Sequence, residues 1–357
     1  MKSIKRSFAL LLIFAFVFTL LGCAGEQPQV PATDSSFAVH FIDVGQADAA
    51  LVLCDGKSML IDGGDAEDSN IIYTYLKNQG VKHLDYIIAT HAHGDHVGGL
   101  SGALNYATVG TAYCPVTEYD SNAFRNFVKY LRYRGKSITV PVAGEKFMLG
   151  SAECTIVAAN TLDNEPNNTS IVMRIVYGET SFMFTGDAER EVEQALAGSK
   201  YTLESTVLKV GHHGSYSSTS YVFLRNVMPS YAVIPVGADN EYGHPTEEVL
   251  SRLRDADVTL FRTDLHGTVI CTSDGKNLVF GTEKAYKGDV FGGIGDNSTV
   301  TDNGRDYVVN TNESSMKFHY PECSSAAKIS EKNRMDYHGT REELIAKGYQ
   351  PCGVCKP

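Results

Sequence analysis

One short stretch, His91-Ala92-His93-Gly94-Asp95-His96, places three imidazoles and one carboxylate within six residues. A protein core accommodates so many ionisable side chains poorly, but they are suitable metal ligands. Alternate residues of an extended segment point to opposite sides, so this segment can supply ligands to two metal ions. Neutral imidazole and carboxylate ligands suit Zn or Mn. The stretch therefore predicts a site for two divalent metal ions.

The segments that flank this hexapeptide alternate between short apolar strands and helical stretches. Strands are expected at 37–44, 49–53, 58–61, 84–89, 170–177, 181–185, 206–210 and 231–236, and helices at 69–79, 188–196, 218–227 and 246–256. Residues that can bind metal follow several strands directly, as at His91, Asp187 and His212. This layout indicates an α/β sandwich with its site at the strand ends.

The order of these motifs resembles that of the metallo-β-lactamase superfamily. The hexapeptide follows an apolar strand, with Leu60-Ile61-Asp62-Gly63-Gly64 upstream and Phe184-Thr185-Gly186-Asp187 downstream. The resemblance implies an αββα sandwich, which we place at residues 37–284. It also implies that His91 and His93 bind one metal, that Asp95 and His96 bind the other, and that Asp187 bridges both.

Two further carboxylates are expected behind the ligands. Asp62 would orient a ligating imidazole, as such ligands generally require; the alternative is a turn residue before Gly63 and Gly64. Asp43 is assigned a similar supporting position. Asp95 is expected to be catalytic as well as a ligand.

A narrower resemblance is to the extracellular hydrolase domain of the ComEC competence (DNA-uptake) proteins and their free-standing relatives. It covers residues 37–282 and rests on five segments, at 41–49, 167–172, 208–215, 242–245 and 262–264. It concerns the hydrolase domain alone and does not imply DNA import itself. Relative to the wider superfamily, no His lies between His96 and His212, and the corresponding stretch offers Asn167 and Asn168. The first metal is therefore expected to be looser, or to be manganese rather than zinc.

The remaining candidate site residues follow the later strands. His212 and His213 are neighbours that point in different directions, so one is expected to ligate while the other meets the substrate; we assign His212 to the metal and His213 to the substrate. Asn168 and Ser215 are assigned to substrate contacts. His244 is expected to contact a substrate phosphate or to protonate the leaving group, the alternative being a cap for the helix that follows.

The first residues predict export and a membrane anchor. A basic start precedes an apolar run at residues 8–21, too short to span a bilayer comfortably. Leu20-Leu21-Gly22-Cys23 resembles a bacterial lipobox, which implies a lipoprotein signal peptide at 1–23, lipidation of Cys23 and a tether at 24–36. The alternative is an uncleaved anchor helix. Both interpretations place the protein at the extracellular face of the bacterial cell membrane.

The C-terminal residues predict a separate zinc-binding module. A Gly-, Asp- and Asn-rich linker is expected at 285–305 and the module at 306–357. His319, Cys323, Cys352 and Cys355 have the spacing of a tetrahedral structural Zn site, and a tail this small needs such a staple. The module resembles that of the Ada DNA-repair protein, in which four cysteines ligate zinc. Because His319 replaces the first of them, methyl transfer is not implied; structural zinc and DNA contact are. The alternative is a disulfide outside the cell.

Composition constrains the substrate. The formal net charge is −11, from 31 basic and 42 acidic residues, which excludes an extended electrostatic footprint for duplex DNA but permits one local site. We expect an exported, membrane-anchored hydrolase, a phosphodiesterase or nuclease that attacks DNA with a metal-bridged hydroxide in DNA uptake or degradation. It is expected to be a monomer. The alternatives are a cell-wall phosphodiesterase, such as a phosphorylcholine esterase, and a non-catalytic lipoprotein that captures DNA.

Overall fold

The computed structural model describes residues 36–160, 165–292, 305–312, 315–321, 323–339, 343–344, 347–352 and 355. The expected signal peptide, Cys23, nearly all of the tether and much of the linker therefore lie outside the described residues. No helix among the described residues is long and apolar enough to cross a membrane.

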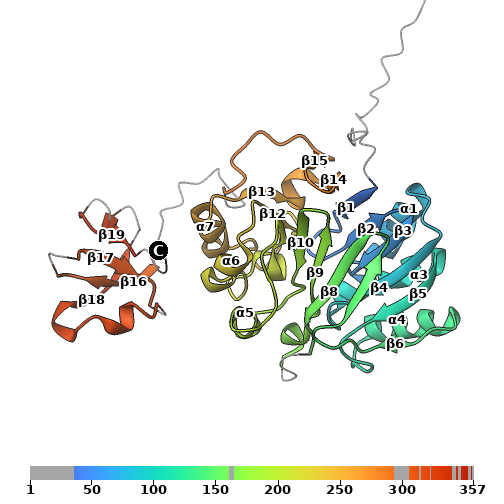
Figure 1. Cartoon of the computed structure of the whole chain (residues 1–357), viewed down its shortest axis with the longest axis horizontal. Helices are drawn as coiled ribbons and strands as arrows, with labels where there is room; N and C mark the ends of the chain where they lie inside the picture. The colour runs from blue at the N-terminus through green and yellow to red at the C-terminus, as the bar shows by residue number, and fades with distance from the viewer. Residues whose placement is uncertain are drawn as a thin grey trace, which may run out of the picture.

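The larger part of the chain is built on two sheets (Figure 1). The strands of the first, in spatial order, are β15 (Leu278–Thr282), β14 (Val269–Ser273), β1 (Phe37–Phe41), β2 (Ala50–Cys54), β3 (Lys57–Ile61), β4 (His83–Ile88), β5 (Thr108–Tyr113) and β6 (Ile138–Thr139). Those of the second are β13 (Thr259–Arg262), β12 (Tyr231–Ile234), β11 (Val207–Lys209), β10 (Thr180–Phe184), β9 (Val172–Tyr177), β8 (Ala152–Ala158) and β7 (Lys146–Leu149).

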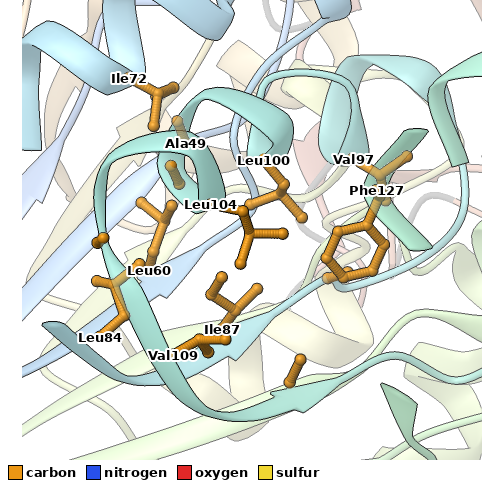
Figure 2. Close-up of a cluster of buried hydrophobic side chains, with 14 of the residues drawn as sticks. Ala49, Leu60, Ile72, Leu84, Ile87, Val97, Leu100, Leu104, Val109 and Phe127 are labelled. Carbon is orange, nitrogen blue, oxygen red and sulfur yellow. The ribbon is translucent and has the colours of Figure 1, made fainter. Parts of the chain in front are cut away.

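Helices cover the outer face of each sheet. Those beside the first are α1 (Ser69–Asn78), α2 (Gly94–Val97), α3 (Leu100–Tyr106) and α4 (Asn122–Tyr133); those beside the second are α5 (Arg190–Ala197), α6 (Tyr221–Val227) and α7 (Glu247–Asp255), and α8 (Thr263–His266) follows β13. Figure 2 shows how the first layer packs: Leu100 and Leu104 of α3 reach Leu60 of β3 and Ile87 of β4. Helices α1, α4, α5 and α7 each bury an apolar stripe, as an amphipathic helix on a sheet should.

A third apolar layer joins the two sheets. The ring of Phe37 lies 5.1 Å from that of Phe182, and the ring of Phe41 lies 5.9 Å from that of Phe184. Strands β1 and β10 are thus buried on both faces, which explains their nearly continuous apolar sequence. Helices, two packed sheets and helices again form the αββα sandwich, so the predicted fold class is confirmed.

The C-terminal residues form a small sheet of their own, in the order β18 (Arg334–Gly339), β16 (Arg305–Asn310), β17 (Lys317–His319) and β19 (Gln350–Pro351). Its core joins Tyr307, Val309 and Phe318 with the three C-terminal cysteines. The chain between the expected domains is not all linker, because Arg262 donates to the carbonyls of Val290 and Gly292. Residues up to 292 therefore stay attached to the sandwich.

Candidate metal centre

The predicted ligands come from loops at one edge of both sheets. Strands β3, β4 and β5 are parallel in the first sheet, and β10, β11 and β12 are parallel in the second. Loops that follow parallel strands meet at the carboxyl ends, where binding sites of such folds form. The hexapeptide follows β4, Asp187 follows β10, and the pair His212 and His213 follows β11.

His91 and His93 face each other with their ring nitrogens. The His91 Nε2 lies 3.0 Å from the His93 Nδ1, and the His91 ring is fully buried. Burial holds the pKa of His91 well below its usual value, with the nearby His96 adding to the effect, so His91 is a neutral imidazole. Ligand atoms on one tetrahedral zinc are roughly 3.3 Å apart, given zinc–nitrogen bonds of about 2.0–2.1 Å. The two nitrogens therefore fit one metal.

A second cluster consists of Asp95, His96, Asp187 and His213, whose ligand atoms all lie within 4.8 Å of one another. The His96 Nε2 is 3.3 Å from the Asp187 Oδ2 and 3.7 Å from the Asp95 Oδ2. The His213 Nε2 is 3.2 Å from that same Asp95 oxygen and 3.7 Å from the Asp187 Oδ2. The four side chains thus surround one point with two imidazoles and two carboxylates.

Two atoms of this cluster are buried without a hydrogen-bond partner, the His96 Nε2 and the Asp187 Oδ1. Buried polar atoms are nearly always paired, so such orphans need an explanation. A divalent cation bound by the four side chains would satisfy both. The donor set and these orphan atoms fit the metal-binding role predicted for the hexapeptide and Asp187.

Asp62 lies directly behind His96. The Asp62 Oδ2 is 2.9 Å from the His96 Nδ1 and accepts the Thr90 hydroxyl at 2.7 Å, while its Oδ1 accepts the Thr90 amide at 2.8 Å. Burial lowers the pKa of His96, but Asp187, Asp62 and Asp95 outweigh it and hold the pKa well above the usual value. The position of Asp62 agrees with the orienting role expected for it. The Gly63 that follows lacks room for a side chain, because a Cβ there would lie 2.8 Å from the Leu100 amide nitrogen.

Asp43 does not occupy the supporting position assigned to it. Its Oδ1 accepts the Gly45 amide at 3.3 Å and its Oδ2 pairs with Lys284 at 3.3 Å, and no hydrogen bond or ion pair among the described residues joins it to the cluster. Asp48, in the same motif, lies there instead: its Oδ1 is 3.2 Å from the His213 Nδ1 and its Oδ2 is 3.9 Å from the His96 Nδ1. Residues 42–48 form an irregular loop, so strand alternation does not show which carboxylate points inward.

Lys209 is a second residue that sequence reasoning missed. It ends β11, is buried, and forms an ion pair with Asp48. Its Nζ also donates to the Gly186 carbonyl at 3.0 Å and lies 3.9 Å from the Asp187 Oδ1. The only available sign was a charged residue inside an apolar strand. Lys209 places a fixed positive charge behind the carboxylates.

Of the paired histidines, one lies inside the four-residue cluster and the other lies outside it. His213 is buried and belongs to the four-residue cluster. The His212 side chain is 23% exposed; its Nε2 is 3.8 Å from the Asp187 Oδ2 and its Nδ1 is 3.5 Å from Glu189. Both residues have positive φ, +49° and +52°, a strained conformation often found at functional sites. This placement favours His213 as the ligand and His212 as the substrate-facing residue, which reverses our assignment of the pair.

The asparagines offered in place of a third histidine lie beside the site. The Asn168 Oδ1, assigned to the substrate, accepts the Glu189 amide at 3.0 Å and so holds that loop. The Asn167 Oδ1 is buried and has no hydrogen-bond partner. Of the two side chains, Asn167 therefore has the oxygen that is free to meet a ligand.

Ser215 and His244 lie on the open side of His212. Ser215 is buried, and its hydroxyl lies 3.1 Å from the Ser217 hydroxyl. The Ser217 hydroxyl in turn donates to the Glu189 carboxylate at 2.9 Å. The His244 ring centre lies 5.7 Å from that of His212, and its Nδ1 lies 3.4 Å from the Gln46 amide nitrogen. Burial, reinforced by His212 and His213, lowers the pKa of His244 to about 4. A neutral imidazole suits substrate contact better than proton delivery.

The C-terminal module gathers its predicted ligands in the same way. The ligand atoms of His319, Cys323, Cys352 and Cys355 lie within 4.8 Å of one another, and all four residues are buried. The His319 Nδ1 has no hydrogen-bond partner, and none of the described cysteines is joined in a disulfide. This donor set fits a tetrahedral zinc ion.

Comparison with known proteins gives a consistent result. The family model described as the metallo-beta-lactamase superfamily matches residues 42–237. ComE operon protein 3 of Bacillus subtilis is 29% identical over 258 residues, 67% of this chain and 33% of that protein. Competence protein ComA of Neisseria gonorrhoeae is 33% identical over 257 residues, 71% of this chain and 34% of that protein.

A ribonuclease Z of Clostridioides difficile is 33% identical over 132 residues, 34% of this chain and 37% of that protein. The chain thus spans about a third of the length of the curated relatives it matches.

Proposed function

The chain belongs to the metallo-beta-lactamase superfamily, and on that basis we propose that it is a metal-dependent phosphodiesterase that cleaves DNA. The observation that carries the proposal is the four-residue cluster of Asp95, His96, Asp187 and His213 beside the facing pair His91 and His93. A divalent metal bound there would lower the pKa of a water molecule and stabilise negative charge on an attacked phosphate. The remaining steps depend on side chains of this chain.

The buried residues behind the centre hold the ligands in place. Asp62 fixes one ring nitrogen of His96. The Pro235 carbonyl, 3.1 Å away, fixes one ring nitrogen of His213, and Asp48 lies 3.2 Å from the same nitrogen, so the opposite nitrogen of each ring points at the cluster. Lys209 neutralises part of the charge of Asp48 and Asp187. Partners of this kind fix the orientation of ligating imidazoles.

The open side of the centre is suited to an anionic substrate. His212 is partly exposed and His244 lies beside it, so both can donate a hydrogen bond to a phosphate oxygen. The amide of Asn167 lies on the neighbouring loop, 3.4 Å from Glu189. Metal ions bound at the centre, together with these hydrogen-bond donors, would supply a local anion site in a protein whose net charge is −11.

The choice of DNA is supported by the relatives. One of them is named a competence protein, ComA, another is named for the ComE operon, and a third is a ribonuclease Z, an enzyme named for cleaving RNA. The zinc module resembles that of a DNA-repair protein and adds a second pointer toward nucleic acid. We propose, further, that the enzyme acts outside the cell, as a lipoprotein anchored through Cys23 and as a monomer, in DNA uptake or degradation.

The proposal is tested with the full chain, purified in mild detergent and supplied with Mn or Zn. We expect hydrolysis of single-stranded DNA and of bis-p-nitrophenyl phosphate, lost in Asp95→Ala and Asp187→Ala. Asp120→Ala, at a fully exposed carboxylate that pairs with Arg125, is the matched control and should keep full activity. DNA binding without turnover in either metal would instead indicate a capture protein. Release of phosphorylcholine from teichoic acid without DNA cleavage would indicate a cell-wall enzyme.

A further inference from the structure

A cleft of about 290 Å³ lies where the sandwich meets the zinc module. Its wall on the sandwich side carries Arg190 of α5, Arg225 of α6 and Arg252 of α7, and its opposite wall carries Tyr320 and Ser324. Figure 1 shows that the module lies on the side of the sandwich that carries these three helices.

The two walls are joined by an aromatic contact. Tyr221 of α6 stacks on Tyr320 with ring centres 5.4 Å apart, and their hydroxyls are 3.3 Å apart. Cys323 and Cys355 of the zinc site line the same cleft, so zinc binding would fix the position of this wall.

None of the three guanidinium groups forms an ion pair in the part of the chain that the structure describes. Among the described residues, no carboxylate lines the cleft either. Arg252 is buried, yet its partners are the neutral carbonyls of Tyr216, Ser218 and Thr219.

Two carboxylates near the cleft are already engaged. Glu193 accepts the backbone amides of Thr219 and Ser220, and Asp255 accepts the Tyr221 hydroxyl. Neither carboxylate lines the cleft, so the charged side chains of its lining, among the described residues, are the three arginines. Guanidinium groups bind phosphate in a planar, bidentate geometry.

Short segments of chain join residues of the cleft to residues of the metal centre. Arg190 follows the cluster residue Asp187 by three positions, and Tyr216 follows His213 by three. The Tyr216 carbonyl accepts both Arg190, at 3.1 Å, and Arg252, at 3.3 Å, whereas the Tyr216 ring is 61% exposed. An exposed aromatic ring on the segment that leads from the metal centre to these arginines is the kind of feature with which proteins bind single-stranded nucleic acid.

We propose that this cleft binds the phosphate backbone of a single-stranded nucleic acid whose scissile diester lies at the metal centre, with Tyr216 stacked on a base between them. The inference rests on the proposed function, since it names the substrate that the same centre would cut. It explains why the sandwich and the zinc module belong to one chain: the module closes the wall that holds the strand.

Two variants alter the two walls of the cleft separately. Arg225→Glu removes an exposed positive charge from α6, and Ser324→Glu adds a negative charge from the module side without touching any arginine. Arg132→Glu makes the same charge change on exposed α4, beside a different hollow, and is the matched control. Tyr216→Ala removes the stacking ring.

Binding is measured by fluorescence anisotropy with a labelled 20-nucleotide single strand. The full, metal-loaded chain carries His212→Ala to prevent cutting, because this change leaves the four-residue cluster intact. We expect Arg225→Glu and Ser324→Glu each to weaken binding about ten-fold and to reduce the slope of log affinity against log salt by about one. Tyr216→Ala should weaken binding about ten-fold, but should not change binding of an abasic strand. Hydrolysis of bis-p-nitrophenyl phosphate, measured in the chain with an intact centre, should stay within two-fold for the two charge variants.

The outcomes separate this inference from the proposed function. The cleft proposal alone is wrong if the small diester is hydrolysed but strand binding is unchanged in both charge variants. It is also wrong if Arg132→Glu weakens strand binding as much as they do. Tighter binding of a poly(glycerol phosphate) chain than of the strand overturns nucleic acid as its ligand. If the charge variants weaken strand binding as expected but neither DNA nor bis-p-nitrophenyl phosphate is hydrolysed, the cleft proposal stands and the proposed phosphodiesterase function is wrong.

Discussion

The buried ion pair of Asp48 and Lys209 behind the metal centre is the feature whose removal should be most informative. Both side chains are only 5% exposed. Asp48→Asn keeps the size of the side chain and removes its charge. It leaves Lys209 charged and buried, with the Gly186 carbonyl and the more distant Asp187, 3.9 Å away, as its remaining partners.

The structure sets the expected magnitude. Removing one partner of a buried ion pair typically costs about 3–5 kcal/mol, because the other charge is left unpaired. For a domain of this size about 4 kcal/mol corresponds to a fall in Tm of roughly 10 °C. Because Asp48 also lies 3.2 Å from the His213 Nδ1, the same change should weaken metal binding about 10- to 100-fold.

Metal-free protein is unfolded by heat and by urea, and metal affinity is measured by competition with a chelator. Lys209→Met in the Asp48→Asn background should recover most of the lost stability, since it removes the unpaired charge, but should not recover metal affinity. Glu153→Gln, which breaks the exposed pair with Lys146, is the control and should change stability by less than about 1 kcal/mol. If Asp48→Asn costs no more than this control, or if the double variant is no more stable than the single one, the reasoning is refuted.

Three further predictions concern other parts of the molecule. His213→Ala should lose a metal ion per chain by elemental analysis, whereas His212→Ala should keep its metals and lose turnover; the opposite pattern would restore our original assignment of the pair. Cys352→Ser should release one zinc ion and lower the melting temperature of the module without slowing bis-p-nitrophenyl phosphate hydrolysis, and zinc content unchanged by this variant would contradict the four-ligand site. His40 is buried against the Tyr75 hydroxyl at 2.8 Å, and burial lowers its pKa from 6.5 to about 4. As the pH falls, the imidazole is therefore protonated in the unfolded chain before it is protonated in the folded one, so about 3 kcal/mol of stability should be lost between pH 6.5 and 4. Urea titrations of His40→Gln should lack that part of the loss. An identical pH profile in the variant would show that His40 does not titrate this way.

The fold could be predicted from the sequence where local patterns were strong. The strands expected at 49–53, 58–61 and 84–89 are β2, β3 and β4, each within one residue of its expected limits, whereas β1 ends three residues before the expected limit of 44. The expected helices at 69–79 and 246–256 are α1 and α7.

Residues between the hexapeptide and η2 (Pro166–Thr169) carried no clear expectation, although they contain α3, α4 and β5 to β8. Strand β7 is an edge strand with exposed alternate residues, and its pairing with β8 in a hairpin determines its conformation rather than its own sequence.

The candidate site shows the same division. The hexapeptide, Asp62 and Asp187 could be located because each directly follows a strand in a recognisable motif. Which of Asp43 and Asp48 supports the ligands could not be predicted, because an irregular loop has no period from which side-chain direction follows. The choice between His212 and His213 depends on two consecutive left-handed residues, a backbone conformation that residue identity does not reveal.

The central claim is that the two-metal centre hydrolyses a phosphodiester of DNA. The most direct measurement is cleavage of a single-stranded oligonucleotide in ¹⁸O-labelled water by the full chain, with its metal content determined on the same sample. Our account predicts turnover that places one ¹⁸O atom in each phosphate end formed and that disappears in Asp187→Ala. A chain that holds its full complement of metal and cuts neither this strand nor bis-p-nitrophenyl phosphate would contradict it.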